Sequence, residues 1–208
     1  CVRARNGEAV AIRNLERFAS TFSVTMEKPK EERKERIAII GAGPAGLSCA
    51  YYLATMGYKP TVFEKNAKAG GMLTYGIPSY KLEKDVIEAE IDILRALGVE
   101  IKCGVEVGKD VTIKQLKEEG YKAFYVAIGC QGGRLPGVPG EDAEGVKIAV
   151  DFLHNATENQ NKKLNGPTIV VGGGNVAVDC ARTAHRFGAK KVSMVCLESR
   201  DTMPASNE

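Results

Sequence analysis

The sequence has 208 residues, enough for one large domain or two small domains with a buried core. Its 29 Lys and Arg residues against 26 Asp and Glu residues give a net charge of +3, and 44% of the residues are hydrophobic, so the composition indicates neither disorder nor a nucleic-acid partner. No apolar run approaches the roughly 18 residues that cross a bilayer, and the N-terminus has no signal-peptide pattern. We therefore expect a cytoplasmic protein that does not enter the membrane.

Six cysteines are spread along the chain without a CxxC pair and without the spacing of metal ligands. This distribution predicts no disulfide framework, no dithiol redox centre and no metal site. Any redox chemistry would then have to come from a bound cofactor.

The first 36 residues predict a helix followed by a charged linker. Apolar residues recur at helical spacing between Ala9 and Phe22. Residues 27–36 contain no apolar residue except Pro29, and we expect them to be solvated.

The next segment predicts a βαβ unit that opens a domain spanning residues 37–145. Its apolar and turn residues predict strands at 36–40, 60–64, 99–103 and 123–128, and helices at 44–56 and 83–97. A glycine-containing loop from Gly70 to Pro78 precedes the second of these helices.

A second unit follows the turn-rich segment 135–141 and begins a domain that we expect at residues 146–208. Strands are predicted at 168–171 and 191–197, and a helix at 175–187. A shift of 131 residues places Gly41 on Gly172 and Gly43 on Gly174, each within the same strand, helix and strand pattern. Two tandem units of this kind suggest two dinucleotides brought face to face.

The first unit carries the glycine pattern of a dinucleotide-binding turn. Gly41, Gly43 and Gly46 follow an apolar strand and open a helix, and Glu64 ends the next strand. In this pattern Gly41 permits the tight turn, Gly43 lets a pyrophosphate approach the backbone, and Gly46 allows close packing of helix on strand. The helix N-terminus offers free N–H groups to the phosphates, and Glu64 can accept hydrogen bonds from a ribose.

Three longer stretches resemble one family. They are GGMLTYGIPSYKLEKDVIEAEIDIL (70–94), AIGCQGGRLPGVPGED (127–142) and GGGNVAVDCARTAHRFGAKKV (172–192). They are similar to the small (beta) subunit of glutamate synthase and its relatives, among them the FAD half of dihydropyrimidine dehydrogenase and, more distantly, adrenodoxin reductase. The resemblance covers nearly the whole chain and implies an α/β fold of two Rossmann-like dinucleotide-binding domains, with FAD on the first and NAD(P)H on the second.

The resemblance also implies which residues bind the two cofactors, and it assigns no catalytic side chain. The residues expected at FAD lie in the first glycine turn, at the end of the second strand and in later loops: Gly41, Gly43, Pro44, Ala45, Gly46, Glu64, Lys65, Gly70, Gly71, Met72, Leu73, Ile77, Val107, Ala127 and Gly129. The residues expected at the nicotinamide dinucleotide are Gly172, Gly174, Asn175, Val176, Glu198 and Arg200.

One departure from the family bears on the choice between NADH and NADPH. Members that use NADPH carry an Arg-Arg pair at the end of the second unit's second strand, whereas this chain has Leu197 and Glu198 there. An acidic side chain repels a 2'-phosphate and suits a free ribose hydroxyl, which favours NADH. Arg200 could still reach a phosphate, so NADPH stays open.

Other polar residues are interpreted as structural. Asp179, on the second unit's helix, is favoured as a structural rather than a catalytic residue. His154 and His185 stand alone and are expected at the surface or in helix packing, and Cys49 and Cys180 are expected in the core.

The N-terminal stretch resembles the end of the iron-sulfur domain that precedes the FAD unit in this family. A cluster needs four thiolates, so Cys1 alone holds none, and residues 1–36 are interpreted as a remnant of that domain with its linker. The family's later strands and closing Gly-Asp segment are not recognised either. We therefore expect a fragment of a longer subunit that is a poor enzyme alone, with these apolar positions partly exposed: Ile169, Val171, Val192 and Met194.

The sequence favours a flavoprotein oxidoreductase that takes a hydride from NAD(P)H and passes electrons through iron-sulfur clusters, present only in the full-length protein, to a partner. By resemblance, the partner is a glutamate synthase large subunit or another redox protein, and a homo-oligomer stays open. The alternatives are a dinucleotide-binding module without catalysis and a dithiol reductase of the thioredoxin-reductase kind, which the missing CxxC pair disfavours.

Overall fold

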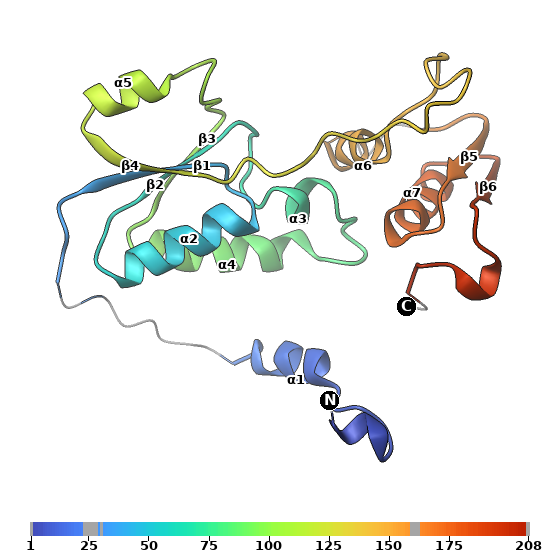
Figure 1. Ribbon diagram of the computed structural model, residues 1–208, viewed down its shortest axis with the longest axis horizontal. Helices are drawn as coiled ribbons and strands as arrows, with labels where there is room; N and C mark the ends of the chain where they lie inside the picture. Colours follow the sequence, from blue (N-terminus) through green and yellow to red (C-terminus); the bar gives the residue numbers. More distant parts are fainter. Residues whose placement is uncertain (1, 23–28, 30, 159–162, 207–208) are drawn as a thin grey trace.

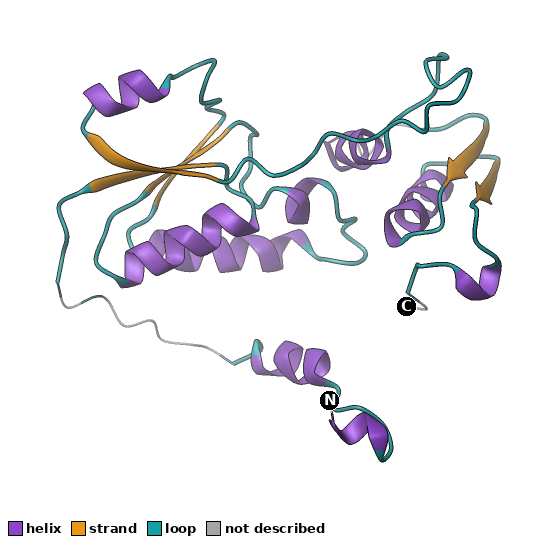
Figure 2. Ribbon diagram, viewed as in Figure 1, coloured by secondary structure: helices purple, strands orange, loops and turns teal. Residues whose placement is uncertain are grey.

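The structure is a computed structural model that describes residues 2–22, 29, 31–158 and 163–206. Cys1 and residues 27, 28 and 30 of the expected linker lie outside this part of the chain. Figures 1 and 2 show helices packed against two separate sheets. In chain order the elements are η1 (Val2–Arg5), α1 (Ile12–Ala19), β1 (Arg36–Ile40), α2 (Pro44–Thr55), β2 (Thr61–Glu64), α3 (Met72–Tyr75), α4 (Lys84–Ala96), β3 (Glu100–Cys103), α5 (Ile113–Glu118), β4 (Tyr121–Val126), α6 (Ala149–Glu158), β5 (Pro167–Val171), α7 (Asn175–Arg186), β6 (Lys191–Val195) and η2 (Arg200–Thr202).

The first sheet has four parallel strands in the order β3-β2-β1-β4. Because successive residues of a strand point to opposite faces, Ile39 and Val62 pack with α2 and α4, whereas Ala38 and Phe63 pack with α5. Figure 1 shows α2 and α4 together on one face and α5 on the other. Both faces of the parallel sheet are therefore covered, as parallel sheets require.

The second sheet pairs β5 with β6 in parallel, and α7 packs against both strands. The side chains of Ile169 and Val171 are 68% and 75% exposed, Met194 is also exposed, and Val192 is half-buried. The expected exposure of these four positions is confirmed, because within the described residues α7 covers a single face of this sheet.

The expected α/β architecture with two Rossmann-like units is confirmed. The strands and helices predicted in the two units differ from the observed ones by at most two residues at either end. The largest differences are at β4, which begins and ends two residues earlier than predicted because Tyr121 is buried and pairs with Arg36, and at the end of β6.

Three α-helices were not predicted. Helix α5 begins with a capping box, in which the Thr112 hydroxyl accepts from the Gln115 backbone and the Gln115 side chain accepts from the Thr112 backbone. This T-x-x-Q pattern is a sequence signal for a helix start. Helix α3 is a single turn inside the expected loop, and α6 lies between α3 and α7, with contacts to both.

The domain boundaries after residues 36 and 145 stay a prediction.

Among the described residues, no helix is both long and apolar enough to cross a membrane.

Gly46 is a site where the fold itself demands glycine. A Cβ on Gly46 would overlap the carbonyl oxygen of Gly41 and press on Ile39. We therefore expect Gly46→Ala to lower the free energy of unfolding by about 3 kcal/mol, in urea titration without added ligand. Gly43→Ala is the matched control in the same turn, because its Cβ would lie 4.0 Å from the nearest atom and its φ is −79°. Equal stabilities of the two variants would contradict the packing argument.

Candidate functional site

The turn after β1 is held by its neighbours on both sides. The backbone N–H of Gly41 donates to the Phe63 carbonyl at 2.8 Å, and a Cβ on Gly41 would overlap the Ala127 carbonyl. Gly41 has a φ of +104°, a conformation that favours glycine. The expected roles of Gly41 in the tight turn and of Gly46 in close packing are therefore confirmed.

Gly43 differs from these two glycines, because nothing inside the protein requires it to lack a side chain. Its φ is in the ordinary extended range, and a Cβ there would meet only the Cα of Gly71, at 4.0 Å. Gly43 is the N-cap of α2, and Pro44 and Ala45 in the first turn are exposed. The missing side chain thus leaves open space in front of a helix N-terminus, the arrangement that accepts a phosphate.

The Gly70–Gly71 turn packs directly onto the first glycine turn. The backbone N–H of Gly70 donates to the Ala42 carbonyl at 2.7 Å, and a Cβ on Gly71 would come within 2.8 Å of the Gly43 Cα. Both Gly70 and Gly71 have positive φ values. The chain then enters α3, so the half-buried side chains of Met72 and Leu73 follow the turn at once.

Lys84, at the start of α4, contacts the backbone of α3 and of the segment that follows it. Its Nζ donates to the carbonyl oxygen of Leu73 at 2.8 Å and to that of Ile77. Burial lowers the pKa of Lys84. The backbone of the two residues expected beside the flavin is therefore fixed by one side chain, which the sequence did not single out.

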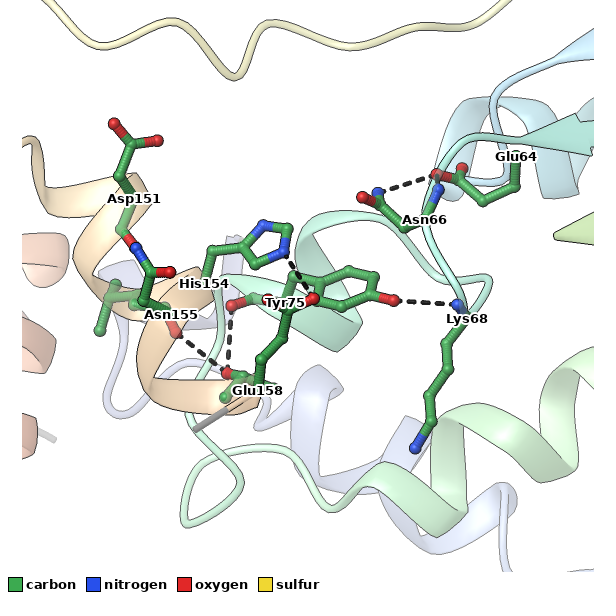
Figure 3. Close-up of polar contacts among 10 residues, drawn as sticks. Glu64, Asn66, Lys68, Tyr75, Asp151, His154, Asn155 and Glu158 are labelled. Atoms are coloured by element: carbon green, nitrogen blue, oxygen red, sulfur yellow. Dashed lines mark hydrogen bonds and ion pairs between the residues drawn. The ribbon is translucent and has the colours of Figure 1, made fainter. Parts of the chain in front are cut away.

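Glu64 is buried at the end of β2, with 5% of its surface exposed. Its Oε2 accepts from the Ala42 backbone N–H at 2.8 Å, and its Oε1 accepts from the backbone N–H and the side-chain amide of Asn66 at 2.9 and 2.8 Å. Figure 3 shows the contact with Asn66. A carboxylate has about four acceptor positions, so one is left for a further donor such as a ribose hydroxyl.

Tyr75 joins this region to α6 (Figure 3). Its hydroxyl accepts from the Lys68 backbone N–H at 2.9 Å, and its ring stacks on His154 with centroids 4.5 Å apart. His154 also lies 3.2 Å from Glu158, and the Thr157 hydroxyl donates to the Tyr75 carbonyl. Burial raises the pKa of Tyr75. The interpretation of His154 as a helix-packing residue is confirmed.

The remaining residues expected at FAD follow the ends of strands of the first sheet. The backbone of Ala127 continues β4, its N–H donating to the Ile40 carbonyl at 2.8 Å, and Gly129 and Lys65 are exposed. Val107 follows the end of β3, where the Val105 N–H donates to the Glu64 carbonyl at 2.9 Å, and it forms a bridge with Val111 and packs against the core cluster on the α5 side. The structure thus brings together the carboxyl ends of β1, β2 and β4, where ligands of such sheets bind.

The second glycine turn repeats the first. The N–H of Gly172 donates to the Val195 carbonyl at 2.8 Å, and Gly172 has a φ of +130°. Gly174, the N-cap of α7, has a φ of −87°, and a Cβ there would meet nothing within 4 Å. Like Gly43, Gly174 is therefore required neither by backbone conformation nor by packing.

The second unit places its acidic residue differently from the first. Ile40 pairs with Phe63 and Val171 with Val195, so the residue in the position of Glu64 is Cys196. Glu198 follows two residues later, yet its Oε2 lies 3.2 Å from the position of a Cβ on Gly173, the middle residue of the turn. In the first turn the middle residue, Ala42, is likewise the partner of Glu64 Oε2. The Glu198 carboxylate therefore lies beside the middle of its glycine turn, as the Glu64 carboxylate does, although Glu198 stands two residues further along the chain.

A segment near residue 205 crosses the second turn, which the sequence did not predict. The Ala205 N–H donates to the Gly173 carbonyl at 3.1 Å, and the Ser206 N–H donates to Asn175 Oδ1 at 2.9 Å. Val176 and Arg200 are exposed beside it.

Two cysteines lie in or beside the core. Cys180 is buried on α7, and burial, with a smaller effect of the Asp179 charge, raises the pKa of its thiol to about 11. Burial also raises the pKa of Cys49. Both thiols are therefore protonated and unreactive near neutral pH, which supports their interpretation as packing residues.

The comparisons with known proteins identify the family. The family model described as pyridine nucleotide-disulphide oxidoreductase matches residues 35–206. The chain belongs to the pyridine nucleotide-disulphide oxidoreductase family. The similarity to glutamate synthase small chains and to the dihydropyrimidine dehydrogenase subunit is confirmed by the relatives below.

Three relatives of this family member match almost the entire chain. They are the NADP(+)-dependent formate dehydrogenase subunit beta of Moorella thermoacetica (41% identity, 99% of this chain and 33% of the relative), the NADPH glutamate synthase small chain of Halomonas elongata (39%, 96% and 45%) and the NAD-dependent dihydropyrimidine dehydrogenase subunit PreT of Escherichia coli O157:H7 (38%, 100% and 51%). The chain thus spans between a third and about half of the length of these relatives. Mycobacterium tuberculosis FprA in complex with NADPH shares the fold, with a TM-score of 0.71 and 24% identity over 84% of this chain and 46% of FprA.

The hydrogen bonds of Glu64 predict the outcome of an isosteric change in this family member. Both carboxylate oxygens accept from N–H groups. In Glu64→Gln an NH2 group replaces one of these oxygens, so in either orientation of the amide two N–H donors face each other. We expect the free energy of unfolding to fall by about 1 to 3 kcal/mol, in urea titration without ligand. Glu100→Gln, an exposed acid on the neighbouring strand, is the control. A Glu64→Gln variant as stable as this control would contradict the assigned network.

Proposed function

We propose that this chain is the dinucleotide-binding core of an NAD(P)H-dependent flavoprotein oxidoreductase, with FAD in the first unit and the nicotinamide dinucleotide in the second. The observation that carries this proposal is the pair Gly43 and Gly174. Each stands at a helix N-terminus, and each lacks a side chain for no internal reason. Family membership supports two such nucleotide sites.

The residues of the first unit fit FAD. Open space at Gly43 would accept the pyrophosphate, and the free acceptor position of Glu64 would take a ribose hydroxyl. Met72, Leu73 and Ile77 follow the turn at Gly70–Gly71, and we propose that they line the flat ring system of the flavin. Bound there, FAD would supply an acceptor for the hydride of NAD(P)H and a donor of electrons to a redox partner.

The protein's own residues would orient the cofactors rather than perform acid-base chemistry. Lys84 holds the segment from Leu73 to Ile77 in one conformation, and the Ala42 carbonyl ties the preceding Gly70–Gly71 turn to the first glycine turn. Hydride transfer needs the reacting atoms about 3 to 3.5 Å apart, so rigid placement is the contribution to be expected of this scaffold.

The electron acceptor is inferred from the names of the relatives and from the N-terminal segment. Relatives are named as subunits of a formate dehydrogenase, of a glutamate synthase and of a dihydropyrimidine dehydrogenase, which supports a redox partner subunit. We propose an iron-sulfur acceptor in the intact protein, and the N-terminal similarity to an iron-sulfur domain supports it. The alternative is a dinucleotide-binding module without catalysis. The visible absorption spectrum of the purified protein before and after NADH separates the two, since only the oxidoreductase would bleach its flavin bands.

Substitutions of Gly43 and Gly174 are predicted to have opposite effects on the binding of the two cofactors. In the intact protein we expect Gly43→Ala to lower flavin occupancy about tenfold or more while leaving NAD(P)H binding in place, because a methyl group would occupy the space of one pyrophosphate. Gly174→Ala should keep its flavin and lose nicotinamide nucleotide affinity by a similar factor. Flavin absorbance per protein and nucleotide titration measure the two effects. Loss of flavin in Gly174→Ala with full flavin in Gly43→Ala would reverse the assignment.

Cofactor choice is predicted to depend on Glu198, whose carboxylate lies beside the middle of the second turn. A 2'-phosphate there would meet like-charge repulsion of about 1 to 3 kcal/mol, so we propose NADH as the preferred donor. Glu198→Arg in the intact protein should shift the ratio of kcat/KM values toward NADPH by about tenfold or more. Glu144→Arg, in an exposed loop, is the control for the change in net charge. A parent protein that already prefers NADPH would overturn the argument and point to Arg200 as the phosphate ligand.

A further inference from the structure

Two adjacent residues of the first unit contact a single face of the second unit's helix. Tyr80 and Lys81 lie in the segment between α3 and α4, and their partners on α7 are Asp179, Arg182 and Arg186. The spacing of these three partners places them along one side of a helix. We call these five residues the interunit latch.

The centre of the latch is an ion pair between an exposed lysine and a buried carboxylate. Lys81 Nζ lies 2.9 Å from Asp179 Oδ1, and the two side chains are 34% and 10% exposed. Loss of Lys81 would leave the Asp179 carboxylate buried without a compensating charge, which is strongly unfavourable. The pair supports the structural interpretation of Asp179.

Tyr80 adds contacts of a second kind. The guanidinium groups of Arg182 and Arg186 lie 4.7 and 4.2 Å from the centroid of its ring, and the Tyr80 hydroxyl is 3.4 Å from the Asp179 carbonyl oxygen. Cation–π contacts at these distances are favourable and directional. The ring is therefore held against two successive turns of α7.

The two segments that the latch joins each lie next to one expected cofactor site. On one side, Lys84 fixes the backbone of Leu73 and Ile77, which are expected beside the flavin. On the other side, Asp179 lies one helical turn after Asn175, at the start of α7 beside the second glycine turn. The latch is thus a direct side-chain link between the loop of the first nucleotide and the helix of the second.

We propose that Lys81, Asp179 and Tyr80 are positioning residues that set the distance between the flavin and the nicotinamide. This inference rests on the proposed function. In the proposed hydride transfer, the C4–H bond of the reduced nicotinamide would break and an N5–H bond of the flavin would form, so that the nicotinamide would be oxidised by two electrons and the flavin reduced by two. The latch donates and accepts nothing in this step. A misplacement of about 1 Å costs a reaction of this type about a hundredfold in rate.

The test compares latch variants in the intact protein by single-turnover reduction of the flavin at saturating NADH. Lys81→Met and Asp179→Asn should each slow reduction about a hundredfold, with flavin content unchanged and nucleotide Kd changed less than threefold. The charge exchange Lys81→Asp with Asp179→Lys should recover at least a tenfold part of that loss. Tyr80→Leu, which keeps the ion pair, should slow reduction by about tenfold and serves where the charge variants fail to fold.

Lys59→Met is the matched control, because Lys59 makes an ion pair of the same 2.9 Å length with Glu32 that is exposed and lies away from α7. It should reduce at the parent rate. Parent-like reduction in Lys81→Met, Asp179→Asn and Tyr80→Leu would overturn the proposal, as would a loss explained entirely by weaker nucleotide binding.

Hydrogen exchange of the protein without cofactors separates this inference from the proposed function. Amides of residues 78–83 and 175–186 should exchange faster in Lys81→Met than in the parent and in Lys59→Met. Unchanged exchange there would overturn the latch whatever the kinetics show. If the parent binds no flavin, the proposed function fails and positioning for hydride transfer fails with it, whereas faster exchange in the variant would still establish the latch as a link between the units.

Discussion

Ala42 is fully buried, and the need to satisfy both of its backbone polar groups organises the first unit. Its N–H is bound by the carboxylate of Glu64 and its carbonyl by the N–H of Gly70. These two bonds bring the end of β2 and the Gly70–Gly71 turn to the same point after β1. A hydrophobic side chain in place of Glu64 would leave a buried N–H unpaired. Glu64 therefore stabilises the fold even without a bound ligand.

The two units share the same backbone arrangement, but their acidic residues, Glu64 and Glu198, differ in burial and in hydrogen bonding. The Glu64 carboxylate is buried and accepts three hydrogen bonds. Glu198 is exposed, and within the described part of the chain its carboxylate accepts no hydrogen bond from the backbone of the turn. A buried, preformed acceptor suits a cofactor that stays bound. An exposed one suits a nucleotide that arrives and leaves with each turnover, which is the division of roles that we propose.

Local patterns were sufficient to predict the frame of both units. Apolar runs bounded by glycines gave β1, α2, β2 and their counterparts to within two residues, because the turn at Gly41 and the packing at Gly46 are dictated by steric contacts between near neighbours. Helix α5 was missed although Thr112 and Gln115 carry its signal. The match between Cys196 and Glu64 was not predicted, because the second unit has one more residue than the first between its glycine turn and the end of its second strand. Contacts such as Lys81 with Asp179 join segments far apart in the chain, and no local pattern encodes them.

Lys84 has a consequence beyond holding its loop. Its ammonium group donates to two backbone carbonyls of the segment from Leu73 to Ile77, and it is partly buried there, which lowers its pKa. If a flavin lies along that loop as proposed, a fixed cation there favours the form of the ring that carries the extra electrons. The midpoint potential of the flavin would then be higher than in free solution, and a lysine far from any reacting atom would help to decide in which direction electrons flow.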